Sequence, residues 1–253
     1  MAGNDMDRPS SRPIPEDEWL RPPARTLGLR QLYPNPTPDA AEIRTRRLRL
    51  DVVAVHGLGG DSYSTFTRDD CLWIRDMLPI CARFQDARIM TFGYDARAFL
   101  HPFARSTTGR TFTFAEELLG SLADRRTEPE EMNRPIIFIG YSLGGIVIKG
   151  ALRHAHALPT QYGNILDSTQ ALVFFGTPHQ GSEAAAWASF LGSVGRAVGV
   201  RTTEVVEELK RWSFPLVELT TTFAELAPRF AITTFFEKKK TNGMLVSHTL
   251  LNT

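Results

Sequence analysis

The chain has 253 residues, a formal net charge of +1 at pH 7 and 42% hydrophobic residues, which suits one α/β domain with an extension. The nearly balanced charge gives no indication of nucleic-acid binding. No stretch approaches the roughly 20 apolar residues of a membrane-spanning helix, so only peripheral membrane contact stays open.

The two cysteines, Cys71 and Cys81, do not have the spacing of a metal site. We interpret them as reduced thiols of an intracellular protein. The glycine-rich segments match neither a dinucleotide fingerprint nor a phosphate-binding P-loop. The sequence therefore implies no metal and no organic cofactor, and it gives no indication of a protein partner.

The chain divides into three parts by composition. Residues 1–26 are rich in proline and charge and carry almost no apolar pattern, which predicts a disordered extension. Residues 27–246 are predicted to form the folded domain, beginning with an edge strand at 27–33. Residues 247–253 are predicted to be a divergent tail. An arginine-rich run at 43–50 alternates with apolar residues, which favours an edge strand or hairpin arm over a binding patch.

From Asp51 onward, short apolar runs alternate with segments of helical periodicity. The predicted strands are 50–55, 87–92, 136–139, 171–175 and 230–236, and the predicted helices are 69–78, 113–125 and 143 to about 158. Such alternation predicts an α/β fold with a mostly parallel sheet and helices on both faces. The carboxyl ends of its strands should form the site.

The pattern around Ser142 is the most informative in the chain. An apolar run ends in Gly-Tyr-Ser-Leu-Gly, and a second apolar run at helical spacing follows. This is the G-x-S-x-G nucleophile elbow in its strand–turn–helix context, which predicts an α/β-hydrolase fold with the Ser142 hydroxyl above the sheet edge. The neighbouring Tyr141 is predicted to shape the pocket.

A glycine-rich loop, HGLGGD, begins at His56 directly after a buried strand. Acyl transfer passes through an oxyanion that backbone N–H groups stabilise, and one donor commonly comes from such a loop. We therefore expect the N–H groups of Leu58 and Leu143 to form an oxyanion hole, with His56 and Gly57 shaping the pocket. Taken alone, the loop fits an ordinary glycine turn equally well.

A further loop, GTPHQGS, contains His179 and follows the strand at 171–175. His179 is predicted to shape the pocket. Residues 182–228 then have helical patterns with many apolar side chains. They form either a lid-like insertion suited to an acyl chain, or helices that pack on the core, and the second alternative is slightly favoured.

With these landmarks placed, residues 27–246 resemble the SERAC-type serine esterases, α/β-hydrolase modules often found at the front of fungal multidomain proteins. The resemblance rests on six motifs in the family's order. These are HGLGGD, WIRDMLP, ARIMTFGYDA, PIIFIGYSLGGIVIK, LVFFGTPHQGS and ITTFFE. It implies a lipase-like serine esterase, with lipid-linked roles at membranes of the endoplasmic reticulum and mitochondria for some members.

A serine hydrolase also needs an acid and a histidine base, in the chain order Ser, acid, His. Glu237 follows the strand at 230–236 and is the candidate acid, with a solvated surface charge as the alternative. His248 is the one histidine beyond it and is the candidate base, with a bystander in a terminal tail as the alternative. Relatives are expected to continue further, so the fold is predicted to be incomplete at the C-terminus.

Two functions follow. The first is a serine carboxylesterase or lipase-like enzyme that acts on an ester or lipid substrate through Ser142. The second is a truncated or impaired hydrolase module that acts by binding a protein or lipid, because a serine without its base is a poor nucleophile.

Overall fold

A computed structural model describes residues 27–36, 47–96, 107–177, 218–219, 221–237 and 246–250, and for 107–112, 236–237 and 246–250 the backbone alone. The predicted disordered extension at 1–26, most of the predicted insertion at 182–228 and the end of the chain at 251–253 lie outside these ranges.

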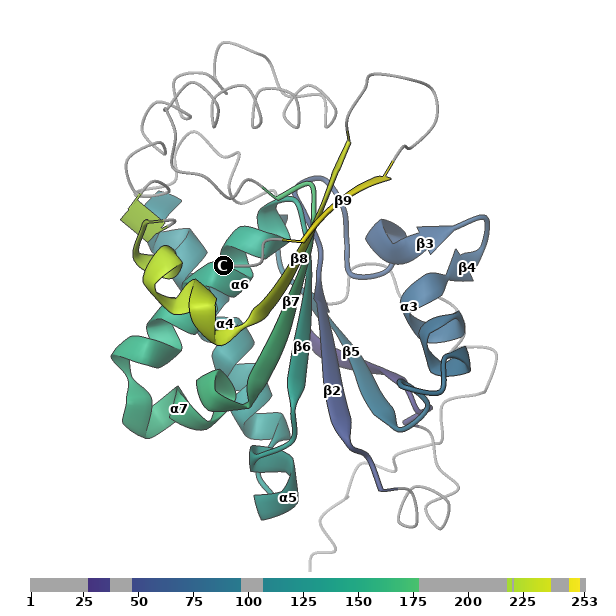
Figure 1. Cartoon of the computed structure of the whole chain (residues 1–253), viewed down its shortest axis with the longest axis horizontal. Helices are drawn as coiled ribbons and strands as arrows, with labels where there is room; N and C mark the ends of the chain where they lie inside the picture. Colours follow the sequence, from purple (N-terminus) through teal and green to yellow (C-terminus); the bar gives the residue numbers. More distant parts are fainter. Residues whose placement is uncertain are drawn as a thin grey trace, which may run out of the picture.

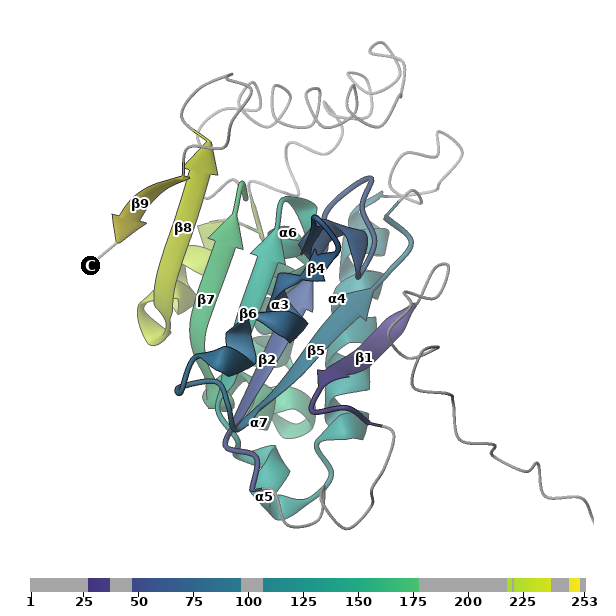
Figure 2. The same cartoon turned by 90° about the vertical axis from the view of Figure 1, so that its right-hand side faces the viewer.

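The described residues are organised around a seven-stranded sheet with the order β1-β5-β2-β6-β7-β8-β9, seen in Figure 2. The strands are β1 (Gly28–Tyr33), β2 (Leu50–Val55), β5 (Ala87–Gly93), β6 (Ile136–Tyr141), β7 (Thr169–Phe175), β8 (Ala231–Glu237) and β9 (Val246–Leu250). The five central strands are parallel, and β1 and β9 pair with them in the antiparallel direction. The six strands predicted from the sequence are confirmed, each within two residues, because continuous β-branched and apolar runs favour buried parallel strands.

Helices cover the two faces of the sheet unequally. The helices and small elements are η1 (Ser64–Phe66), β3 (Thr67–Arg68), β4 (Cys71–Leu72), α3 (Trp73–Asp76), η2 (Leu78–Ile80), α4 (Thr107–Arg125), α5 (Pro129–Met132), α6 (Leu143–Ala157), α7 (Pro159–Ser168) and η4 (Ala227–Arg229). The long helices α4, α6 and α7 lie on one face, and α3 with the β3–β4 hairpin lies on the other (Figure 1). Each face has its own apolar core, and the one beneath the long helices is the larger.

The helix predicted at 69–78 is wrong in its first half. Asp69 and Asp70 have φ values of 48° and 61° and form the turn of the β3–β4 hairpin. Helix α3 therefore begins only at Trp73. At the start of this helix, the Asp76 carboxylate accepts a hydrogen bond from the backbone N–H of Leu72 at 2.8 Å. Asp and Asn tolerate the left-handed conformation that such a turn requires, and here that local preference outweighs the helical spacing of the apolar residues.

The arginine-rich run and the start of α4 also differ from prediction. Residues 47–49 of the arginine-rich run are not in a strand, and the earlier part of that run lies outside the described residues. Residue 246, the predicted end of the domain, is the first residue of β9, which extends to Leu250. Helix α4 begins at Thr107, six residues earlier than predicted.

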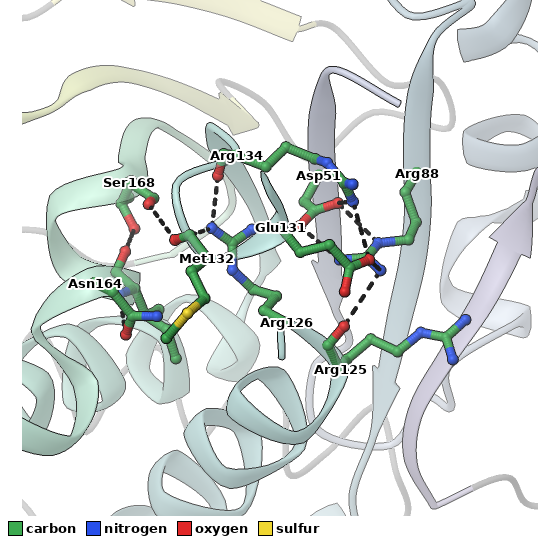
Figure 3. Close-up of polar contacts among 11 residues, drawn as sticks. Asp51, Arg88, Arg125, Arg126, Glu131, Met132, Arg134, Asn164 and Ser168 are labelled. Atoms are coloured by element: carbon green, nitrogen blue, oxygen red, sulfur yellow. Dashed lines mark hydrogen bonds and ion pairs between the residues drawn. The ribbon is translucent and has the colours of Figure 1, made fainter. Parts of the chain in front are cut away.

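A cluster of buried ions joins the amino ends of the central strands (Figure 3). The Asp51 side chain is fully buried and accepts from Arg88 Nε at 2.8 Å and Nη2 at 2.9 Å, from Arg134 Nη1 at 3.2 Å and from Arg126 Nη1. Glu131 accepts from Arg88 at 2.6 Å. Since these groups come from β2, β5, the residue after α4, α5 and the turn before β6, the cluster ties five segments together at the edge opposite Ser142.

Candidate functional site

The elbow at Ser142 has the backbone geometry that the motif predicts. Ser142 has φ 52° and ψ −117°, a conformation that residues other than glycine rarely adopt, and it stands between the end of β6 and the start of α6. Its N–H donates to the carbonyl oxygen of Phe175 at 2.8 Å. Its own carbonyl oxygen accepts from the hydroxyl of Thr177 at 2.9 Å. Two anchors from β7 and the loop after it therefore hold the strained turn.

The glycines of the elbow and of the HGLGGD loop allow close packing. A Cβ at Gly144 would overlap the carbonyl oxygens of Val55 and His56, so α6 can start this close to the end of β2 only with glycine at that position. A Cβ at Gly57 would lie 2.8 Å from Ser142 Cβ and 2.9 Å from the carbonyl oxygen of Tyr141. The loop after β2 thus packs directly against the serine.

The Ser142 side chain lies in a shielded position. The residue is 7% exposed, and its Oγ has no hydrogen-bond partner among the residues that the structure describes. A buried hydroxyl normally has a partner, so an unpaired one is a feature of functional sites. Tyr141, the preceding residue, is 47% exposed and marks the side from which solvent approaches the elbow.

Of the two backbone donors predicted for the oxyanion hole, Leu143 directly follows Ser142, and Leu58 follows Gly57, which packs against the serine. The N–H of Leu143 is in the first turn of α6, where helix geometry provides no acceptor. The N–H of Leu58 likewise has no backbone acceptor within the described ranges. Both side chains are buried, so the surrounding core holds the two backbone segments in place.

The ring of His56 is enclosed and fully engaged. It is 1% exposed, and it stacks on the ring of Tyr94 with centroids 4.4 Å apart. Its Nδ1 lies 2.9 Å from the carbonyl oxygen of Gly57, and its Nε2 lies 3.2 Å from the backbone nitrogen of Tyr94. The hydroxyl of Tyr94 donates to the carbonyl oxygen of His56 at 2.9 Å.

The surroundings of His56 favour its neutral form. Burial lowers the pKa of His56 below its ordinary value, although the hydrogen bonds and the charge of Asp61 act in the opposite direction. Burial alone would raise the pKa of Asp61, but the hydrogen bonds from Ser64 and Tyr63 outweigh it and the pKa is lowered. Asp61 is therefore ionised at neutral pH and holds the turn that follows the glycines.

The other predicted site residues are placed only in part. Glu237 is the last residue of β8 and pairs with Val246 of β9, and His248 pairs with Phe235. The side chains of Glu237 and His248 lie outside the described part of the chain, as does the whole of His179. In the register of the sheet, Tyr141 pairs with Phe175, Phe175 with Phe235, and Phe235 with His248. The Cα atoms of Tyr141 and His248 are therefore three strand spacings apart, which is about 14 Å.

Three residues that the structure brings to this region carried no role in the sequence interpretation. Thr177 and Tyr94 both stand within two residues of a strand's carboxyl end, which is the signal that could have identified them. Lys149 is 1% exposed on α6, with Nζ 5.5 Å from the ring centroid of Phe174 and 5.6 Å from that of Phe223. Burial lowers the pKa of Lys149 to about 7. Lys149 lies in an apolar run of the sequence, and that pattern gave no sign that its amine is buried.

The described residues contain no group of three or more His, Cys, Asp or Glu side chains placed to hold a metal ion. No helix among them is long and apolar enough to span a bilayer.

Comparison with known families agrees with this geometry. The family described as "Putative serine esterase (DUF676)" matches residues 48–209, well over half of the chain. The chain belongs to this family. The matched range contains both the HGLGGD loop and the elbow at Ser142, and membership supports a hydrolase with the α/β-hydrolase fold.

Curated relatives match at modest identity. Protein SERAC1 of Bos taurus is 26% identical over 211 residues, which are 75% of this chain and 30% of that protein. Protein SERAC1 of Danio rerio is 25% identical over 213 residues, again 75% of this chain and 30% of that protein. The chain thus spans about a third of the length of these relatives, and the resemblance to SERAC-type esterases predicted from the motifs is confirmed.

Solved structures include two similar hydrolases. A Bacillus licheniformis lipase is 20% identical with a TM-score of 0.47, covering 81% of this chain and 70% of that one. The carboxylesterase EstE1 is 13% identical with a TM-score of 0.39, covering 76% of this chain and 71% of that one. The assignment to the family does not depend on these two similarities.

Proposed function

We propose that the protein is a serine hydrolase that cleaves carboxylic esters, with Ser142 as its nucleophile. The observation that carries the proposal is the strained backbone of Ser142, φ 52° and ψ −117°, at a strand–helix elbow packed against a glycine-rich loop. Backbone strain of this kind persists where the surroundings enforce it, and it concentrates at functional sites. Membership of a serine esterase family supports the same conclusion.

The proposed reaction uses two backbone donors. Ser142 Oγ attacks the ester carbonyl carbon and gives its proton to a base, while the carbonyl oxygen becomes an oxyanion between the N–H groups of Leu58 and Leu143. The alcohol leaves as the C–O bond breaks and takes the proton from the base, which leaves an acyl-enzyme on Oγ. Water then adds to the acyl carbon by the same route and releases the carboxylic acid. Pocket walls would come from His56, Gly57, Tyr141 and His179.

We propose Glu237 as the acid that orients the base, because it ends the strand after β7 in the order that the triad requires. His248 is the base predicted from the sequence. In the register of β9 its Cα lies about 14 Å from that of Tyr141, beyond the combined reach of a histidine side chain and a hydrogen bond. Use of His248 therefore requires β9 to leave this register.

The separation of His248 from the elbow in this register favours a second function. A chain in which no histidine reaches Ser142 would retain the fold and act as a protein- or lipid-binding module. By its family resemblance, either form would have a lipid-linked role at membranes of the endoplasmic reticulum or mitochondria. Imaging of the tagged protein with markers for both organelles tests that location, and a diffuse signal would contradict it.

The decisive experiment is covalent labelling with a fluorophosphonate probe, with folding checked by circular dichroism. Wild type is expected to label and Ser142→Ala is not. His248→Ala, compared with His156→Ala at an exposed position in the last turn of α6 as a control, then shows whether His248 supplies the base. A folded wild type that neither labels nor hydrolyses p-nitrophenyl esters would overturn the enzymatic proposal and favour the binding module.

A further inference from the structure

We infer that His56 and Tyr94 are a pair of positioning residues that hold the HGLGGD loop so that the N–H of Leu58 points at the developing oxyanion. This inference rests on the proposed function, and it gives a role to two residues outside the Ser, acid and His set. Neither residue needs to touch the substrate. Their effect passes through the backbone of the loop.

Two hydrogen bonds and one ring stack link His56 in the loop after β2 to Tyr94 in the loop after β5. A third bond joins His56 Nδ1 to the carbonyl oxygen of Gly57 within the loop. The Tyr94 hydroxyl holds the carbonyl oxygen of His56, while the Tyr94 backbone N–H holds the imidazole. Tyr94 in the loop after β5 thus holds both the backbone carbonyl and the side chain of His56.

The HGLGGD loop has few side chains of its own to hold it in place. Three of the four residues after His56 are glycines, and Gly59 has φ 78°. Glycine backbone is conformationally permissive, so the position of the Leu58 N–H depends on what restrains the two ends of the loop. His56 restrains the first end, and Asp61, which accepts from Tyr63 N, Ser64 N and Ser64 Oγ, restrains the second.

Both nitrogens of the His56 imidazole are engaged, so the ring is not free for proton transfer. Its Nε2 accepts from the Tyr94 N–H, because a backbone nitrogen can only donate, and its Nδ1–H therefore donates to the carbonyl oxygen of Gly57. This arrangement needs the neutral ring with the proton on Nδ1. A catalytic base needs an unoccupied nitrogen that faces the serine, so His56 acts by holding the loop and not as a base.

The restraint on the loop should affect kcat, because oxyanion stabilisation depends on preorganised donors. Oxyanion donors act only when they already point at the charge that develops, and removing one such donor costs about 10²–10³ in kcat. A loop that drifts by a fraction of an ångström loses part of that effect without changing the contacts of the bound ground state. Loosening the pair should therefore lower kcat and leave KM nearly unchanged.

The first test is Tyr94→Phe, which removes the hydroxyl bond to His56 and keeps the ring. Tyr162→Phe is the control, since Tyr162 is also buried, at 8% exposed against 4% for Tyr94, lies on α7 and accepts from Gln161 at 2.9 Å. We expect Tyr94→Phe to lower kcat for a p-nitrophenyl ester by about tenfold with KM within about twofold. Tyr162→Phe should change neither. Equal activity of the two variants would overturn the inference.

The second test separates the two bonds of the imidazole. In His56→Gln the side-chain oxygen reaches the Nε2 position and can accept from Tyr94, whereas in His56→Asn the shorter side chain keeps the local bond to Gly57. The cross-loop bond is the important one here, so Gln should retain about tenfold more kcat than Asn. An Asn variant at least as active as the Gln variant would contradict the inference.

A third measurement does not depend on activity. Long-range ¹H–¹⁵N spectra of the wild-type histidines, with His56 assigned by its loss in His56→Gln, should show a neutral ring with the proton on Nδ1 at pH 7. A proton on Nε2 would overturn the hydrogen-bond arrangement. If the wild type fails to hydrolyse esters but shows this tautomer, the proposed function fails while the His56–Tyr94 link stands.

Discussion

Replacing Asp51 with asparagine should destabilise the fold severely. The Asp51 carboxylate is fully buried and each of its oxygens accepts from two guanidinium groups. In Asp51→Asn one oxygen becomes an NH₂ group, so two guanidinium donors face a donor instead of an acceptor. The three arginines also lose their fully buried counter-charge, and among the described residues Glu131 remains in contact with two of them, Arg88 and Arg134.

The expected magnitude follows from these contacts. Removing one partner of a buried ion pair costs about 3–5 kcal/mol, because the remaining charge stays buried without compensation. For a domain of this size that corresponds to a fall in Tm of about 6–20 °C. Glu131→Gln is the matched control, since the Glu131 side chain is 21% exposed and contacts two of the same arginines. It should cost about 1 kcal/mol.

Urea unfolding followed by circular dichroism measures both free energies. The cluster lies at the start of β6 and Ser142 follows its end, about 20 Å away along the strand. Folded Asp51→Asn protein should therefore label with a fluorophosphonate as wild type does. A cost for Asp51→Asn no larger than that for Glu131→Gln would refute the reasoning, because it would mean that the arginines do not depend on this carboxylate.

Three further predictions concern the elbow and the helix behind it. Thr177→Val removes the hydroxyl that holds the Ser142 carbonyl oxygen, so fluorophosphonate labelling should slow by about tenfold, whereas Thr177→Ser keeps the bond and the rate. Gly57→Ala places a Cβ 2.8 Å from Ser142 Cβ and should lower ester hydrolysis at least ~100-fold. Gly120→Ala is its control, because a Cβ there meets nothing within 4 Å in the middle of α4, and it should raise the unfolding free energy by up to ~1 kcal/mol. Lys149→Met removes an amine whose pKa is lowered to about 7 by burial. Between pH 7 and pH 9 the unfolded chain keeps the lysine proton that the folded chain releases, so wild-type stability should rise over this range relative to the variant, by about 1.4 kcal/mol per pH unit.

Each of these has a contrary outcome. Equal labelling of Thr177→Val and Thr177→Ser would show that the hydroxyl does not hold the elbow. Full activity in Gly57→Ala would mean that the loop after β2 stands further from the serine than the backbone indicates. Parallel stability curves for wild type and Lys149→Met from pH 7 to pH 9, measured by urea unfolding, would show that the buried amine keeps an ordinary pKa.

Much of the architecture could be predicted because its signals are local. Strands β2 and β6 are continuous runs of β-branched and apolar residues, and such runs need both faces of a sheet covered. The elbow at Ser142 is readable for the same reason, since a strand, five motif residues and a helix are contiguous in the chain. The error at 69–78 arose where two local signals conflict. Apolar spacing there favours a helix, while Asp69 and Asp70 favour a turn.

The sequence by itself determined the order of strands and helices, the place of Ser142 at a strand's end and the glycines that pack around it, because each depends on neighbours in the chain. The tertiary structure decided which distant groups meet. Asp51 is 75 and 83 residues from two of its arginines, Thr177 is 35 residues from the Ser142 carbonyl it holds, and Tyr94 is 38 residues from His56. No periodicity encodes such pairs, since they form only when parallel strands bring their ends to a common edge, where burial favours hydrogen bonds between polar groups.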